Sequence, residues 1–153
     1  MSILNQKTLK KEVKFKGIGL HTGKEVSINV CPSKPNTGIV FKRIDLDKNN
    51  IVLPNIFNVT NATLCTTISN EYGVSISTIE HLMAALYGLG VDNALIEITS
   101  QEVPIMDGSA KEFIAKFLTA GFDTSEVPIK LIKIINDVSI QDGSKYISIG
   151  KSN

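Results

Sequence analysis

The sequence has no tryptophan, only two cysteines and two histidines, and a single arginine among its sixteen basic residues. Because Cys31 and Cys65 are too few for a disulfide framework, we expect a reduced, cytoplasmic protein. Nucleic-acid binding usually depends on an arginine-rich basic surface, which a chain with Arg43 alone and a net charge of +1 does not offer. The composition therefore predicts no nucleic-acid partner.

Long hydrophobic runs are absent as well. No stretch approaches the roughly 18 consecutive apolar residues of a membrane-spanning helix, so none is expected. Residues 1–7 contain no continuous apolar segment and do not resemble a signal peptide. With 153 residues, 42% of them apolar, the chain has room for one ordinary domain, or for one domain and part of another.

Short runs of β-branched residues between turn residues predict a strand-rich protein. Residues 7–16 alternate apolar and charged side chains, and residues 25–30 place Val26, Ile28 and Val30 on one face. We expect these two segments to form a hairpin around a glycine-rich turn. Further strands are expected at residues 38–42, 56–59, 63–69, 74–76 and 93–99.

Two amphipathic helices are predicted. The first spans residues 78–89 with Ser77 as its N-cap, and its opening matches the capping-box pattern with Glu80 in the third helical position. Its apolar residues recur at helical spacing: Ile79, Leu82, Met83 and Leu86.

The second predicted helix spans residues 110–120, with Ser109 as N-cap and Gly121 just past its end. Its apolar stripe consists of Phe113, Ile114, Phe117 and Leu118. Strands followed by helix, strand and helix predict an α+β fold, in which a mostly antiparallel sheet carries two helices on one face.

The last part of the sequence repeats the pattern of the first. Residues 131–140 and 145–149 form a second predicted hairpin that resembles the first in length and alternation. We therefore expect residues 1–126 to form a complete first domain and residues 127–153 to be the first hairpin of a second copy. Because an isolated hairpin is marginally stable, this one is expected to pair with further structure.

Glu80 and His81 are the sharpest chemical feature. Small residues at Ala84, Ala85 and Gly88 lie near His81 on the helix, so a second layer of structure could approach this side. Two interpretations remain open here. Glu80 could serve only as a capping residue and His81 as an ordinary packed imidazole, or a carboxylate beside a metal-ligating imidazole could act as a general base.

The other motifs favour structural roles by themselves. The turn at residues 17–23 is glycine-rich but does not lead from a strand into a helix, so it does not match a dinucleotide-binding fingerprint. Residues 106–109 are typical of a turn that delivers a helix N-cap. The spacing of the four cysteine and histidine residues matches no compact zinc motif.

Five motifs follow one another in a distinctive order and spacing from residue 6 onward. They are Gly17-Ile18-Gly19-Leu20-His21-Thr22-Gly23-Lys24, Leu64-Cys65-Thr66, Ile76-Ser77-Thr78-Ile79-Glu80-His81-Leu82, Gly90-Val91-Asp92-Asn93 and Pro104-Ile105-Met106-Asp107-Gly108-Ser109. Together they resemble the UDP-3-O-acyl-N-acetylglucosamine deacetylases, zinc amidases at the committed step of lipid A synthesis. The resemblance implies a duplicated sandwich of two α+β domains, with helices between two sheets.

The resemblance also implies residue roles. Glu80 would be the general base that activates a Zn²⁺-bound water, and His81 would be the one zinc ligand from the first domain. The substrate, UDP-3-O-acyl-N-acetylglucosamine, would lie near Thr63, Leu64, Cys65 and His21.

The family's other zinc ligands and its general-acid histidine lie in the second domain, but this chain has no histidine after Val127. The chain is therefore expected to be a catalytically incomplete fragment whose partner is its own second domain. A stand-alone, non-catalytic binding module and one half of a split enzyme are the alternatives.

Overall fold

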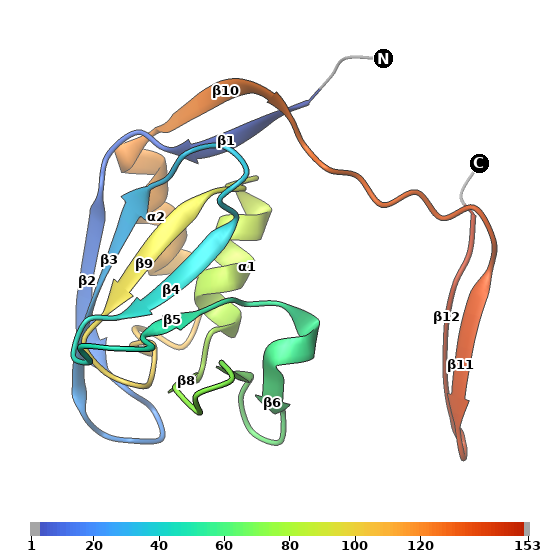
Figure 1. The fold of residues 1–153 in the computed structure, drawn as a ribbon, viewed down its shortest axis with the longest axis horizontal. Helices are drawn as coiled ribbons and strands as arrows, with labels where there is room; N and C mark the ends of the chain where they lie inside the picture. Colours follow the sequence, from blue (N-terminus) through green and yellow to red (C-terminus); the bar gives the residue numbers. More distant parts are fainter. Residues whose placement is uncertain (1–3, 152–153) are drawn as a thin grey trace.

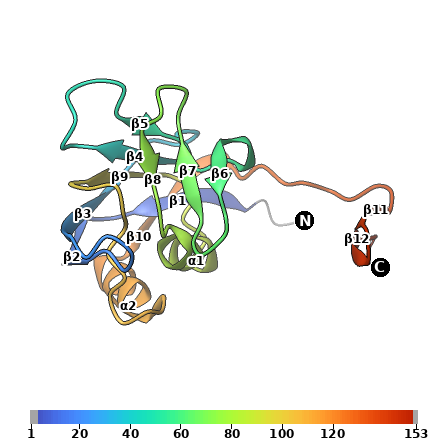
Figure 2. The ribbon, with the colours of Figure 1, turned by 90° about the horizontal axis from the view of Figure 1, so that it is seen from below.

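The computed structural model describes residues 4–151; residues 1–3 and residues 152–153, which belong to the expected first and second domains, lie outside it. Its centre is a five-stranded sheet in the order β2 (Val13–Ile18), β3 (Glu25–Pro32), β9 (Ala94–Ile98), β4 (Ile39–Arg43) and β5 (Ile51–Val52). Figures 1 and 2 show α1 (Glu80–Gly88) and α2 (Lys111–Ala120) together on one face of this sheet. Only the β4–β9 pair is parallel, so the expected α+β fold with a mostly antiparallel sheet is confirmed.

The core lies between this sheet and the two helices. Val26, Ile28 and Val30 of β3 all point into it and are buried, as their alternation predicted. Phe15 of β2 meets the α2 rings of Phe113 and Phe117 at centroid distances of 4.8 and 5.6 Å. These rings hold α2 against the edge strand β2 of the sheet.

Two smaller sheets complete the main body. The three-stranded sheet contains β6 (Val59–Asn61), β7 (Thr67–Ser69) and β8 (Ser75–Ile76), and β8 leads directly into α1. The first strand, β1 (Asn5–Leu9), pairs with β10 (Phe122–Pro128), which follows α2. In the described part of the chain, neither helix is long and apolar enough to cross a membrane.

A hairpin of β11 (Val138–Asp142) and β12 (Lys145–Ile149) stands apart from the main body in Figure 1. The expected second hairpin is thus confirmed, although its first strand begins at residue 138 and not at 131. On one face, Val138 pairs with Ile149 and Ile140 with Ile147, and all four side chains are exposed.

The segment predicted as one strand over residues 7–16 contains two strands with different partners. β1 ends at Leu9, the charged residues Lys10, Lys11 and Glu12 form an exposed turn, and β2 begins at Val13. Leu9 and Val13 are both buried, so the chain turns to place both in the core. Only β2 forms the expected hairpin with β3.

Two strand predictions between residues 56 and 69 were wrong in part. Ile56–Asn58 form a 3₁₀ turn because the Asn55 side chain accepts hydrogen bonds from the N–H groups of Phe57 and Asn58. The strand expected over residues 63–69 starts only at Thr67, because Asn61 Oδ1 accepts from the Thr63 N–H and folds the preceding residues into a turn.

The predicted capping box at the start of α1 was wrong. The helix begins at Glu80, two residues later than expected, and no side chain caps it. Thr78 has a φ of 57°, in the left-handed region, so it cannot belong to the helix. Ser77 instead pairs with Gln101 through its N–H group.

The second helix follows its prediction more closely. It begins at Lys111, so its N-cap is Ala110 and the prediction of Ser109 as N-cap was wrong, although Ser109 Oγ accepts from the Lys111 N–H at 3.1 Å. The helix ends at Ala120 and is followed, as expected, by Gly121 with a φ of 76°. Phe113 and Phe117 are buried as expected. Leu118 is 58% exposed, so its predicted place in the core was wrong.

Candidate active site

The start of α1 carries two buried polar atoms without hydrogen-bond partners. Glu80 Oε1 accepts from the Thr66 backbone N–H at 2.5 Å, whereas Glu80 Oε2 has no partner among the described residues. His81 Nδ1 is also buried and also has no hydrogen-bond partner among the described residues. Buried polar groups are nearly always satisfied, so two such atoms on adjacent residues make the start of α1 the candidate site; Asn29 Oδ1 on β3 is the third unpartnered atom of this kind among the described residues.

The turn over residues 61–66 is brought against Glu80 by the Thr66 hydrogen bond. It carries the predicted substrate-contacting residues Thr63, Leu64 and Cys65. Leu64 is 83% exposed and Thr63 is also exposed, while Cys65 is half-buried with its Sγ 3.8 Å from Thr67 Oγ1. The structure joins this solvent-accessible turn to Glu80 through the Thr66 N–H and shows no hydrogen bond from Thr63, Leu64 or Cys65 to the Glu80 carboxylate.

His21 lies in the exposed turn between β2 and β3. Its backbone N–H donates to Glu102 Oε1 at 2.9 Å, and Glu102 Oε1 also accepts from Thr78 Oγ1 at 3.0 Å. Among residues 4–151, no hydrogen bond joins the His21 side chain to Glu80 or His81. The structure therefore connects the His21 turn to the start of α1 through Glu102.

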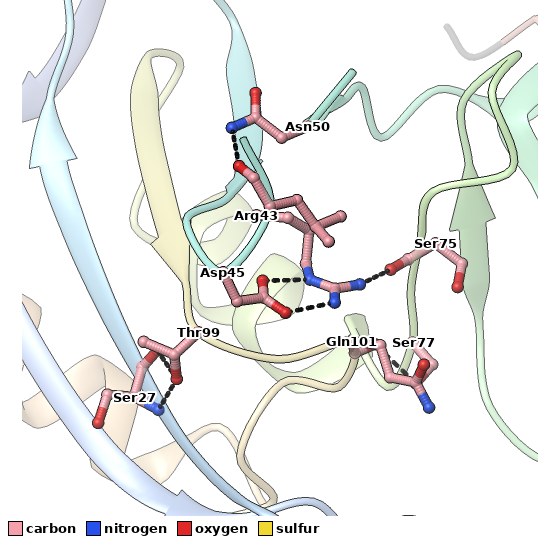
Figure 3. Close-up of polar contacts among 9 residues, drawn as sticks. Ser27, Arg43, Asp45, Asn50, Ser75, Ser77, Thr99 and Gln101 are labelled. Atoms are coloured by element: carbon pink, nitrogen blue, oxygen red, sulfur yellow. Dashed lines mark hydrogen bonds and ion pairs between the residues drawn. The ribbon is translucent and has the colours of Figure 1, made fainter. Parts of the chain in front are cut away.

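The segment that enters α1 is held from both sides, as Figure 3 shows. Arg43 binds Asp45 through two hydrogen bonds of 2.7 and 2.6 Å, and its Nη1 donates to the Ser75 carbonyl at 3.1 Å. The Arg43 guanidinium donates to Asp45 and lowers the pKa of its carboxyl, so the pair stays charged at neutral pH. On the other side, the Ser77 N–H donates to the Gln101 carbonyl at 2.9 Å.

Glu102 is fully buried, yet its carboxylate is charged at neutral pH. Burial alone would raise the pKa of this carboxyl. Hydrogen bonds from the backbone N–H of His21, from Thr22 and from the Thr78 hydroxyl outweigh that effect and hold the pKa below its ordinary value of 4.5.

Sequence reasoning missed three residues of this arrangement: Thr66, Thr78 and Glu102. The sequence contains one usable signal, because Glu102 is an acidic residue directly before the apolar run Val103-Pro104-Ile105. A carboxylate in such a run is expected to be buried and to have specific partners. Nothing in the local sequence indicates that those partners lie about 80 residues earlier, in the His21 turn.

The described residues fit zinc in part. An imidazole nitrogen and a carboxylate oxygen without protein partners are donors of the kind that zinc takes. Catalytic zinc sites use about three protein ligands. No cluster of three histidine, cysteine or acidic side chains that could hold a metal occurs within residues 4–151. Within residues 4–151, the His81 imidazole is thus a donor of the kind that zinc takes, but the described residues bring no further such side chains together with it into a set of three.

Comparison with known proteins matches most of this chain to one family. The model of the LpxC family, described as UDP-3-O-acyl N-acetylglycosamine deacetylase, matches residues 6–152. Curated proteins named UDP-3-O-acyl-N-acetylglucosamine deacetylase are similar to the same region. The one from Blochmanniella pennsylvanica is 44% identical over 147 residues, covering 96% of this chain and 50% of that protein.

Two further relatives with the same name give the same picture. The Haemophilus influenzae strain PittEE protein is 44% identical over 144 residues, covering 94% of this chain and 47% of its own length. The Actinobacillus succinogenes protein is 43% identical over 147 residues, covering 96% of this chain and 48% of its own length. The chain thus spans about half the length of the curated relatives it matches. The family match over residues 6–152 and these identities show that the chain belongs to the LpxC family.

Proposed function

We propose that this chain forms the half of a UDP-3-O-acyl-N-acetylglucosamine deacetylase of lipid A biosynthesis that carries the general base. The observation that supports this most is the pair of partnerless buried atoms, Glu80 Oε2 and His81 Nδ1, at the start of α1. A purely structural carboxylate and imidazole would be expected to have partners within the fold. The family membership adds the reaction class.

Glu80 is suited to accept a proton from water. One carboxylate oxygen is held by the Thr66 N–H, which fixes the orientation of the side chain, and the other oxygen is free of protein partners. In the proposed reaction, Glu80 takes a proton from the attacking water as the new C–O bond forms. The amide C–N bond then breaks as its nitrogen takes up a proton from a general acid expected outside residues 4–151, and the products are acetate and the free amine of the sugar.

His81 would hold zinc as one ligand of a set completed outside residues 4–151. Zinc, when bound, would supply a water of lowered pKa and would polarise the amide carbonyl. The exposed Leu64, with its neighbours Thr63 and Cys65, would contact the acylated sugar, and His21 would contact the substrate from the turn between β2 and β3. This assignment uses the apolar character and exposure of Leu64, which suit an acyl chain.

We further propose that the main body, about residues 1–126, is the first domain and that residues 127–153 begin a second, similar domain. The four exposed aliphatic side chains on one face of the β11–β12 hairpin support this, since such a face gains stability only when it is covered. The proposed enzyme is a cytoplasmic hydrolase. Its proposed reaction on an acylated sugar does not require a membrane-spanning helix in residues 4–151.

A chimera tests the proposal. The whole chain is fused in front of the remaining half of the Haemophilus influenzae relative, and the release of acetate from UDP-3-O-acyl-N-acetylglucosamine is measured. We expect activity, with Glu80→Gln lowering it about a hundredfold or more and His81→Ala removing bound zinc. Glu71→Gln, at an exposed position on the same three-stranded part of the fold, is the matched control and keeps full activity.

Two outcomes would contradict the proposal. A zinc-loaded chimera that is equally active with the Glu80→Gln change would exclude Glu80 as the general base. A chimera that folds but neither binds zinc nor releases acetate would favour a non-catalytic binding module, the alternative supported by the absence of a three-ligand cluster within the described residues.

A further inference from the structure

The carboxylate of Glu102 joins two segments that the chain separates widely. It lies after β9, is fully buried, and is reached from the turn between β2 and β3 and from the entry to α1. The backbone N–H groups of His21 and Thr22 donate to it, each at 2.9 Å and each to a different oxygen. The Thr78 hydroxyl donates to it at 3.0 Å. One carboxylate thus satisfies donors from both segments.

Gly19 shows how closely the turn wraps around this carboxylate. A Cβ atom at position 19 would lie less than 3.0 Å from Glu102 Oε2 and from Thr22 Oγ1, and Gly19 is itself buried. Only glycine allows this approach. The turn that carries His21 is therefore shaped around the carboxylate, and the hydrogen bonds are part of its conformation.

Thr78 is the second half of the link. A β-branched residue with a φ of 57° is strained and persists only where its surroundings hold it. Its hydroxyl is held by Glu102, and the Val103 N–H donates to the Ser77 carbonyl beside it at 3.1 Å. The conformation of Thr78 sets the direction in which the next residues, Ile79 and Glu80, enter α1.

We propose that Glu102 is a positioning residue that holds the His21 turn and the Glu80–His81 pair in one fixed arrangement. The functional part of this inference rests on the function proposed above, because only there do His21, Glu80 and His81 act on one substrate. Glu102 touches none of the proposed reacting groups. It acts through Thr78 on one side and through the backbone of residues 21 and 22 on the other.

Nuclear magnetic resonance of the isolated chain, without substrate or metal, tests the link. The chain has two histidines, so ¹⁵N-histidine labelling gives one imidazole spin system for His21 and one for His81. Hydrogen exchange of the Thr66 amide reports independently on Glu80, whose carboxylate it binds. We expect Glu102→Gln to shift both imidazole spectra and to speed Thr66 exchange at least tenfold.

Substitutions at Thr78 keep the test informative if Glu102→Gln does not fold. Thr78→Val removes the hydroxyl while keeping the shape, so it is expected to shift the His81 signals and speed Thr66 exchange, leaving His21 unchanged. Thr78→Ser restores the hydroxyl and both readouts. Glu97→Gln, on β9 but accepting only from Asn29 at 3.4 Å, is the matched control and changes neither histidine.

The proposal is overturned if Thr78→Val leaves the Thr66 exchange and the His81 signals as they are. It is equally overturned if Glu102→Gln affects His21 alone, or if Glu97→Gln produces the same shifts. None of these readouts measures catalysis. An inactive chimera together with the expected spectra would thus refute the proposed function and leave the Glu102 link intact. An active chimera with unchanged spectra would support the proposed function and refute the link.

Discussion

Phe15 offers the sharpest test of what holds α2 on the sheet. Its ring is 2% exposed and packs against Phe113 and Phe117, with interplanar angles of 54° and 79°. The Lys116 ammonium lies 4.7 Å from the ring centroid. Truncating such a ring, as in Phe15→Ala, costs about 4 kcal/mol of unfolding free energy through lost burial and the cavity left behind. That is a large share of the about 5–15 kcal/mol that stabilises a typical domain.

Phe15→Leu separates ring chemistry from simple burial. Leucine retains most of the apolar volume but loses both aromatic pairs and the cation–π contact, so we expect a loss of about 2 kcal/mol. Both values are measured by urea unfolding followed by far-ultraviolet circular dichroism. Phe57→Ala is the control, because Phe57 is 93% exposed and its truncation is expected to change stability by less than about 0.5 kcal/mol.

The result that would refute this reasoning is a Phe15→Ala variant no less stable than Phe57→Ala. A Phe15→Leu variant as stable as the unsubstituted chain would refute the contribution of the ring contacts alone. In that case burial, and not aromatic geometry, would account for the attachment of α2.

Three further predictions concern the site and its scaffold. Because the folded pKa of Glu102 lies below its ordinary 4.5, its contribution to stability is complete above about pH 4.5 and is lost as the pH falls through the folded value; melting temperatures between pH 6 and pH 3 should therefore fall more steeply for the unsubstituted chain than for Glu102→Gln, and parallel curves would contradict this. Gly121→Ala should lower the free energy of unfolding by about 1 kcal/mol or more, because position 121 has a φ of 76°. Urea unfolding would measure this loss, with Gly88→Ala as the control because position 88 has open space around it. The isolated chain should lose added zinc on dialysis, since His81 alone cannot retain it, and one zinc ion per chain by atomic absorption after dialysis would overturn that expectation.

The sequence predicted those elements in which the spacing of apolar residues reflects burial of one face. Val26, Ile28 and Val30 alternate because one side of β3 faces the core, and that signal is local. It also predicted the end of α2, because a glycine with positive φ follows the last helical residue. Family motifs pointed to Glu80 and His81, and both side chains have partnerless buried atoms in the structure.

The misses share a physical cause. Ser77 to Glu80 have the composition of a capping box, but tertiary bonds from Gln101 and Glu102 hold Ser77 and Thr78 outside the helix. Leu118 has helical spacing with the core residues yet lies on a side of α2 that the described residues leave exposed. Local sequence contains neither the long-range partner in the first case nor the extent of the covering layer in the second.

The pairing of β1 with β10 bears on the order in which this chain folds. Asn5 pairs with Pro128 and Leu9 with Phe122, so β1 finds its partner only after all the other elements of the main body have been synthesised. Closing so long a loop early is entropically unfavourable, and contacts of this kind slow folding. The central sheet and its two helices can assemble from nearer partners first. Although β1 precedes the rest of the main body along the chain, it is therefore among the last strands to pair, and the side chain of Leu9, buried in the folded protein, stays accessible to water or to chaperones until then.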